Sequence, residues 1–69
     1  MSYITGDFIR ALREKEKMTQ KELAAQLCVS DKTISKWETN KGLPDISIIE
    51  ELAKALKISV TDLFTGEYT

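Results

Sequence analysis

The stretch that decides the fold is Thr19–Glu38, which reads TQKELAAQLCVSDKTISKWE. Thr19 is followed three residues later by Glu22, and this pair predicts a capping box that opens a helix. Ser30 is a good N-cap for a second helix, which we expect to end near Glu38 or Thr39. Apolar side chains recur in both halves of the stretch at the three- or four-residue spacing of a helix. We therefore predict two short helices in direct succession.

The connection between these two helices is very short. Only Cys28 and Val29 separate the first apolar run, which ends at Leu27, from Ser30. Ala24 is small enough to let the helices cross closely, and Val29 is apolar and suited to tuck the turn onto a core. The stretch therefore predicts a tight helix-turn-helix unit at about residues 19–39.

Three further helices complete the prediction. A first helix runs from about Gly6 to Glu16, with Thr5 as its N-cap. A fourth helix is capped by Asp45, and a short fifth helix is opened by a second capping box, Ser59–Asp62. The residues expected to form the core of these three helices are Phe8, Ile9, Leu12, Ile46, Ile49, Leu52, Ala53, Leu56, Leu63 and Phe64. Because no strand pattern is present, we predict an all-α fold, a compact five-helix bundle that forms one domain over residues 5–66.

The composition excludes several classes of function. The 69 residues are 42% hydrophobic and 30% charged, which is typical of a soluble globular domain. The absence of histidine and the single cysteine exclude imidazole catalysis, the common zinc sites and an internal disulfide. Since no glycine-rich phosphate loop occurs either, we expect a binding module without a catalytic site, metal, cofactor or small-molecule substrate. No apolar stretch is long enough to span a membrane and no signal peptide is apparent, so we expect a cytoplasmic protein.

The net charge of −1 hides an uneven distribution along the chain. Residues 1–41 contain eight Lys and Arg against six Asp and Glu, whereas residues 42–69 contain two against five. A polyanion would meet the basic first part, with the acidic part facing away. The distribution therefore admits a nucleic-acid partner despite the acidic total.

The second helix of the unit has two chemically distinct faces. A turn of about 100° per residue places Ile34 and Trp37 together on one side, towards a core. Lysines and small hydroxyl groups point the other way, which suits the major groove of DNA, because lysine donates to guanine and hydroxyls serve any base. The residues expected to contact bases are Asp31, Lys32, Thr33, Ser35 and Lys36.

The strings TQKELA and VSDKTISKWE, together with LAKAL at residues 52–56, resemble the Cro/CI-type, Xre-like family of helix-turn-helix repressor domains. The resemblance covers Phe8 to Phe64 in order. It implies a lambda-repressor-like DNA-binding domain with the helix-turn-helix at its second and third helices. It also implies a sequence-specific transcriptional regulator, foremost a repressor, that binds a double-stranded DNA operator as a homodimer.

The same resemblance implies roles for particular residues. Gln20 opens the second helix, where family members bond a phosphate, and the loop Thr39–Lys41 lies along the phosphate backbone. Arg13 and Glu38 occupy positions that pair as a partly buried salt bridge, which is a structural feature. Together with neighbouring cations, the residues expected to contact phosphates are Arg10, Gln20, Lys21, Ser30, Thr39, Asn40 and Lys41.

Two positions depart from the family pattern. Cys28 and Lys57 stand where the family commonly has a glycine in a left-handed conformation. A side chain costs roughly 1–2 kcal/mol in that conformation, so either the strain is tolerated or the turns adopt another geometry. Cys28 is otherwise expected to be a small, half-buried turn residue.

Other interpretations stay open at this point. Ile48, Leu63, Phe64 and Tyr68 are either ordinary packing residues or an exposed apolar patch for a second subunit. The same fold also serves as a protein-interaction module, as in an antitoxin or a bridging factor. A module that binds only protein would show no salt-sensitive binding to DNA, and this difference separates the two functions.

Overall fold

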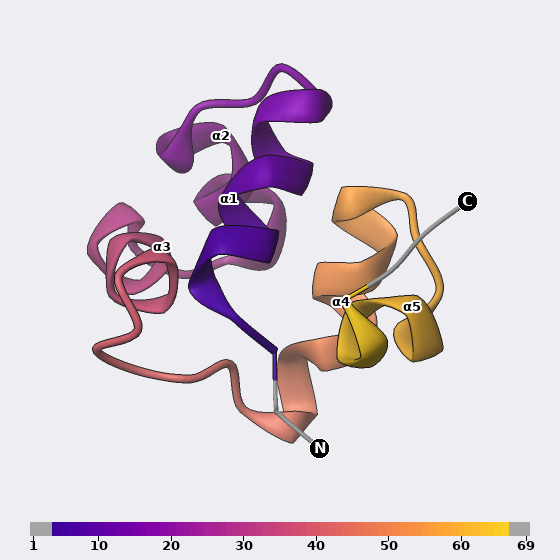
Figure 1. The fold of residues 1–69 in the computed structure, drawn as a ribbon. Coiled ribbons are helices and arrows are strands. Elements are labelled where there is room, and N and C mark those ends of the chain that lie inside the picture. The colour runs from indigo at the N-terminus through magenta and orange to yellow at the C-terminus, as the bar shows by residue number, and fades with distance from the viewer. Residues whose placement is uncertain (1–3, 67–69) are drawn as a thin grey trace.

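Five helices follow one another in residues 4–66, the part of the chain that this computed structural model describes (Figure 1). They are α1 (Gly6–Lys15), α2 (Gln20–Leu27), α3 (Asp31–Glu38), α4 (Ile46–Leu56) and α5 (Val60–Thr65). No strand occurs in this part of the chain, so the predicted all-α, five-helix fold is confirmed. α1 ends one residue earlier than expected, because Glu16 is its C-cap.

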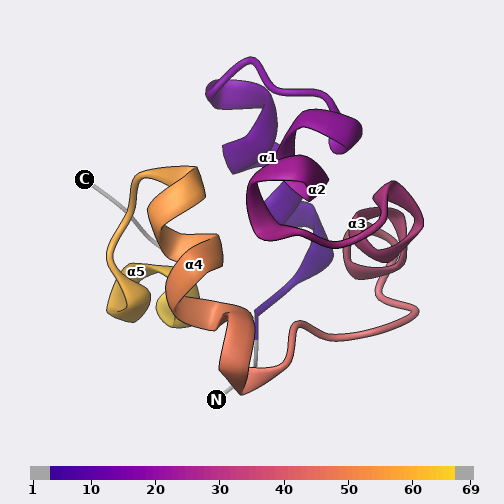
Figure 2. The ribbon, with the colours of Figure 1, turned by 180° about the vertical axis from the view of Figure 1, so that it is seen from behind.

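The helices surround one core, with α3 on one side of the molecule and α4 and α5 on the other (Figures 1 and 2). α2 packs against both α3 and α4, α1 packs against α3, and α4 packs against α5. Residues 39–45 connect the end of α3 to the start of α4 without forming a helix. Within residues 4–66, no helix has the length and apolar character needed to cross a membrane.

Each helix begins at a polar side chain that caps it. The N-caps are Thr5, Thr19, Ser30, Asp45 and Ser59, and each accepts a bond from a backbone N–H of the first turn. The capping box at Thr19 is complete: its hydroxyl accepts from the Glu22 N–H at 3.0 Å, and its own N–H donates to the Glu22 carboxylate at 2.8 Å. The second predicted box is only half formed. The Asp62 N–H donates to the Ser59 hydroxyl, but an aspartate side chain is one methylene shorter than the glutamate that reaches back.

The core consists of the apolar residues that the helical spacing predicts, with one correction. Ile49, Leu52 and Leu56 of α4 are buried, but Ile46, which we expected in the same stripe, is 72% exposed. Ile46 is the first residue of α4, directly after its N-cap Asp45, and its side chain lies at the exposed start of the helix. Ile4, which precedes α1, is buried in addition. The completely buried side chains are Ile9, Leu12, Leu23, Ile34, Leu52, Leu56 and Leu63.

The apolar residues near α5 mostly belong to the core. Leu63 is fully buried, so the interpretation that it belongs to an exposed apolar patch is wrong. Ile48 and Phe64 are partly buried against the core. Tyr68 lies outside the described residues. The large apolar side chains that are exposed among residues 4–66 are instead Leu43, Ile46 and Val60.

Four of the described residues other than glycine adopt the left-handed backbone conformation: Lys17, Cys28, Asn40 and Lys57. Cys28 and Lys57, with φ of 58° and 62°, are the C-caps of α2 and α4, the two positions at which the family commonly has glycine. The turns therefore keep the left-handed geometry and accept strain of roughly 1–2 kcal/mol at each residue. Cys28 is exposed rather than half-buried, because its place at the C-cap leaves its side chain outside the core.

Replacing Cys28 with glycine is expected to stabilise the domain by about 0.5–1 kcal/mol. Glycine adopts the left-handed conformation without strain, and this gain is partly offset by the greater conformational entropy of glycine in the unfolded chain. Urea denaturation followed by circular dichroism measures the difference in free energy of unfolding. Ala25→Gly is the matched control, since Ala25 is exposed inside α2, where glycine costs about 0.5–1 kcal/mol. Equal destabilisation by the two variants would show that the turn stores no strain.

Candidate nucleic-acid interface

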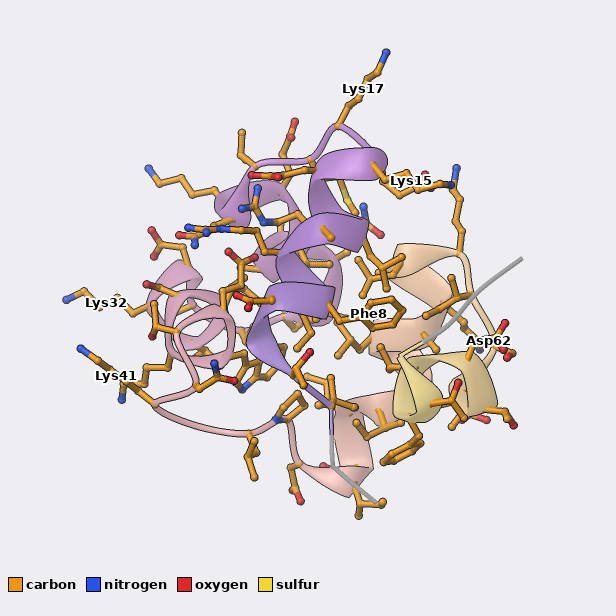
Figure 3. All side chains as sticks on the ribbon, viewed as in Figure 1. Phe8, Lys15, Lys17, Lys32, Lys41 and Asp62 are labelled. Carbon is orange, nitrogen blue, oxygen red and sulfur yellow. The ribbon has the colours of Figure 1, made fainter. Side chains whose placement is uncertain are left out.

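α3 turns one face to the core and the other to solvent. Ile34 is fully buried and Trp37 is 6% exposed, which confirms the predicted inner face. Lys32 and Lys36 are exposed on the opposite face. Figure 3 shows Lys32 projecting from the molecule on the same side as Lys41. The half-buried residues beside the two α3 lysines are Asp31, Thr33 and Ser35.

The start of α3 is held by two hydroxyl groups. The Thr33 N–H donates to the Ser30 hydroxyl at 3.2 Å, and the two hydroxyl oxygens lie 3.1 Å apart. Asp31 lies in the first turn, where a negative charge suits the positive end of the helix dipole. These contacts fix the conformation of the first turn of α3, which carries Lys32.

Glu38, the last residue of α3, is a buried carboxylate that joins three helices. Arg13 of α1 binds it through two nitrogens: Nε lies 2.6 Å from Oε2, and Nη2 lies 3.1 Å from Oε1. Gln20, the first residue of α2, donates from Nε2 to Oε1 at 3.0 Å. The remaining Arg13 nitrogen, Nη1, donates to the Met18 carbonyl at 2.7 Å. Because the side chains of Glu38 and Arg13 are only 1% and 11% exposed, solvent screens this ion pair little.

The surroundings of Glu38 keep it ionised. Burial alone would raise the pKa of its carboxyl, but hydrogen bonds from Arg13 and Gln20, with the charges of Arg13 and Arg10, outweigh burial and lower this pKa. The hydrogen bond to Glu38 in turn raises the pKa of the Arg13 guanidinium, against its partial burial. Both shifts favour the charged pair, so α1 and α3 are joined by full charges at neutral pH.

Arg10 and Gln20 both lie against this carboxylate. The Arg10 side chain is 57% exposed, and its Nε lies 3.8 Å from Glu38 Oε1. Gln20 is half-buried and turns its Nε2 towards the carboxylate, whereas Lys21 is exposed. The sequence did not reveal the bond between Gln20 and Glu38, because the two residues lie 18 positions apart and no local pattern links them.

The loop after α3 holds the remaining residues expected at phosphates. Lys41 is exposed and points away from the body of the molecule (Figure 3). The Thr39 hydroxyl donates to the Ser35 carbonyl at 2.9 Å, so its proton is engaged within the molecule. The backbone of Asn40 is in the left-handed conformation, and its side-chain Oδ1 accepts a hydrogen bond from the Gly6 N–H at 2.9 Å. This bond ties the loop to the start of α1.

Gly6 allows α1 to approach the end of α3 more closely than any other residue would. A Cβ atom at Gly6 would lie 2.4 Å from the Trp37 carbonyl oxygen and 2.5 Å from the Glu38 carbonyl oxygen. The first turn of α1 therefore rests directly on the last carbonyls of α3. The sequence shows only a glycine at the start of a helix. It does not indicate which segment packs against that glycine.

Charge is unevenly distributed over the molecule as well as along the chain. Lys32 and Lys41 project on the α3 side, whereas Asp62 of α5 lies on the opposite side (Figure 3). Glu50 and Glu51 are exposed on α4. The α3 side therefore presents exposed cations that attract an anion.

Residues 9–63 match the helix-turn-helix family. Similar proteins include the HTH-type transcriptional activator BcrR of Enterococcus faecalis, 37% identical over 59 residues. They also include the HTH-type transcriptional repressor RghR of Bacillus subtilis, 46% identical over 54 residues. These matches cover 86% and 77% of this chain but 29% and 40% of the two relatives, so the chain spans less than half of their length.

The fold is similar to that of the c2 repressor of Salmonella phage P22, whose crystal structure was solved in complex with a synthetic operator. The TM-score is 0.85 and the sequence identity 35%, with 96% of this chain and 100% of that chain covered. The capping box at Thr19, the tight turn before Ser30 and the buried face of α3 all fall within the matched residues. The chain therefore belongs to the helix-turn-helix family, of the Cro/CI-type, Xre-like kind.

Proposed function

We propose that this domain binds double-stranded DNA in a sequence-specific manner and represses transcription by occupying an operator, with α3 in the major groove. The observation that carries the proposal is the exposed pair of Lys32 and Lys36 on the outer face of α3. The similarity to a repressor that was solved on an operator supports the same docking of the helix. The proposed role requires no catalytic step, metal or cofactor, because occupancy alone blocks access to the DNA.

In this proposal, α3 reads the base sequence. Lys32 and Lys36 donate to O6 and N7 of guanine, and Asp31 accepts from N4 of cytosine. The half-buried Thr33 and Ser35 lie beside the lysines and serve as short-range partners to either kind of base. Specificity then depends on side chains whose positions are fixed by the buried face of the same helix.

Affinity in this proposal comes mainly from the phosphate backbone. Each cation that neutralises a phosphate releases counterions, so binding weakens steeply with salt. Neutral groups and backbone N–H groups at helix starts fix the register of the protein on the duplex without reading sequence. The proposed phosphate contacts are Arg10, Gln20, Lys21, Ser30, Asn40 and Lys41. Thr39, which the resemblance placed among them, donates both its hydroxyl and its N–H to the Ser35 carbonyl and would have to break a bond first.

We further propose that two copies of the domain occupy one operator. A single module of this size buries only about 600–1,000 Å² of protein surface on DNA, which is little for tight binding. A pair of domains related by two-fold symmetry would contact two half-sites roughly 34–36 Å apart on the same side of the duplex. An inverted repeat in the preferred DNA sequence is the expected signature.

Lys36→Ala is expected to cost roughly 1–3 kcal/mol of binding free energy on the preferred sequence and to relax the preference at one base position. The reason is that the lost ammonium group donates to a base edge. Binding titrations against the preferred duplex and its single-base variants measure both effects. A uniform loss over all sequences would contradict the assignment of Lys36 to base reading.

Lys41→Ala is instead expected to weaken binding to every sequence alike and to reduce the slope of log affinity against log salt by about one unit. Lys54→Ala is the matched control, because Lys54 is an exposed lysine on α4 and its removal changes the net charge equally. Titrations at several salt concentrations distinguish the two variants. Equal slopes of log affinity against log salt for K41A and K54A would show that Lys41 does not contact the DNA.

The proposed function as a whole is tested by selecting bound duplexes from random DNA and by gel-shift titration at two salt concentrations. If the domain is such a regulator, the selected duplexes share a common sequence, and the domain binds this sequence more weakly at higher salt. The same fold used as a protein-interaction module would recover no common sequence and show no salt-sensitive shift, and this outcome would replace the proposal.

A further inference from the structure

An open groove lies between the start of α1 and the end of α5. Its volume is about 440 Å³, within the range of roughly 300–1,000 Å³ that small-molecule sites in proteins occupy. Phe8, which lines the groove, lies between α1 and the side of the molecule formed by α4 and α5, whereas Lys32 and Lys41 project on the other side (Figure 3). A molecule bound in the groove would therefore leave the candidate nucleic-acid interface open.

The floor of the groove is apolar. Phe8 and Ala11 line it from α1, and Leu63 and Phe64 line it from α5. Leu63 is fully buried, and the two phenylalanines are half-buried against the core, so the folded core supports this floor. An apolar molecule that packs on these side chains removes apolar surface from water, which favours binding.

An exposed carboxylate borders the apolar floor. Asp7 is the one charged residue among the described residues that line the groove. Its charge suits the positive end of α1, but its carboxylate forms no hydrogen bond or ion pair with any residue between 4 and 66. Arg10, the cation that follows it most closely in α1, lies against Glu38 instead. A cation with an apolar body is therefore complementary to the groove.

The extent of the groove indicates a small ligand and not a protein. A stable protein–protein interface buries at least about 1,000 Å² of surface, which requires apolar contacts well beyond one groove. The large apolar side chains that are exposed in the described part of the chain are Leu43, Ile46 and Val60, and none of them lines the groove. Exposed apolar surface is thus not concentrated at this place.

We propose that the groove between α1 and α5 binds a small organic ammonium ion. The apolar body of the ligand packs on Phe8 and Phe64, and its charged group pairs with the Asp7 carboxylate. The ligand is bound without chemical change. The inference goes beyond the proposed function, because it gives the domain a second ligand on a face that does not meet DNA.

Three probes that share a phenyl ring test the inference. Phenethylammonium, phenethyl alcohol and phenylacetate carry a positive, a neutral and a negative head group, and each is titrated into the isotope-labelled chain and followed by NMR. Phenethylammonium is expected to shift the backbone N–H signals of residues 5–11 and 63–66, with a dissociation constant of about 1 mM. It should bind about threefold to fivefold more tightly than the alcohol, because an exposed ion pair contributes modestly, and phenylacetate should bind most weakly. Equal affinity for the three probes, no shift with phenethylammonium, or shifts centred on Lys32 and Lys36 would overturn the inference.

Three variants identify the groups that hold the probe. Asp7→Asn should bind phenethylammonium no more tightly than the alcohol, with the affinity for the alcohol unchanged. Glu14→Gln is the matched control, because Glu14 is an exposed carboxylate of α1 outside the groove and its loss changes the net charge equally. Ala11→Leu fills the floor from an exposed helical residue and should prevent binding of every probe. Equal effects of Asp7→Asn and Glu14→Gln, or full affinity in Ala11→Leu, would contradict the assignment. Since no DNA enters these titrations, their outcome is independent of the proposed function.

Discussion

Glu38→Ala is expected to destabilise the domain by about 3–5 kcal/mol, the largest effect of any polar substitution in the described residues. The change removes the partner of a guanidinium that is only 11% exposed and leaves its charge without compensation. It also removes the acceptor of the Gln20 side-chain amide. Urea denaturation of the wild type and the variant measures the loss. Glu51→Ala is the control, because Glu51 is an exposed carboxylate on α4 and its loss should change stability by less than about 0.5 kcal/mol.

A double-mutant cycle shows whether the loss belongs to the ion pair. Arg13→Met alone should also be strongly destabilising, since it leaves the buried carboxylate without its charge partner. The double variant R13M/E38A should cost clearly less than the two single variants together, because neither residue then leaves a buried charge. Strict additivity would mean that Arg13 and Glu38 contribute separately and that the pair is not the unit of stability.

The acid sensitivity of the fold provides a second measure of the same carboxylate. Because the folded-state pKa of Glu38 is lowered from the ordinary value of 4.5, its contribution is complete above that value and is lost as the pH falls through the folded-state pKa. The free energy of unfolding of the wild type should therefore decrease more steeply below about pH 5 than that of Glu38→Gln. Parallel pH profiles of the two proteins would contradict the assignment.

Gly6→Ala is expected to cost about 2–3 kcal/mol, although alanine is the better helix former. The new methyl group would lie 2.4 Å from a backbone carbonyl oxygen, which cannot move aside as the end of a flexible side chain would. The first turn of α1 must then shift away from α3, and the bond between the Gly6 N–H and Asn40 would be strained or lost. Thermal and urea denaturation both report the change.

Gly42→Ala is the matched control for Gly6→Ala. A Cβ atom at Gly42 would lie 3.7 Å from the Cβ of Lys36, an ordinary van der Waals distance. This variant should change stability by less than about 0.5 kcal/mol in either direction. If Gly6→Ala were equally neutral, the close approach of α1 to the end of α3 would be absent in solution.

The sequence predicted those parts of the molecule that local rules govern. The N-caps at Thr19 and Ser30 and the apolar spacing within each helix depend on residues three or four positions apart, so these elements were predicted well. The ion pair between Arg13 and Glu38 came from the family resemblance rather than from any local pattern. Ile46 was placed in the core wrongly, because helical periodicity does not show which residues at the start of a helix are left exposed.

Contacts between distant segments could not be predicted in this way. The bonds from Gln20 to Glu38 and from Gly6 to Asn40 join residues 18 and 34 positions apart. Both residues that accept these bonds lie at or just after the end of α3, where the sequence suggested only a helix terminus and a polar loop. The same contacts determine how the amides at the candidate interface are oriented, so the finest detail of the site depends on tertiary structure. The proposed base contacts remain predictions.

The Glu38 carboxylate has a consequence for the smallest fragment that retains function. An isolated peptide spanning residues 19–38 would contain every side chain proposed to read a base, yet it would lack Arg13, the cation that neutralises this acid. Such a peptide would carry an unpaired negative charge against DNA and would lose the ordered helix pair that α1 supports. Transferring the helix-turn-helix segment alone would therefore not transfer its DNA binding. A chimeric regulator would need α1 together with α2 and α3.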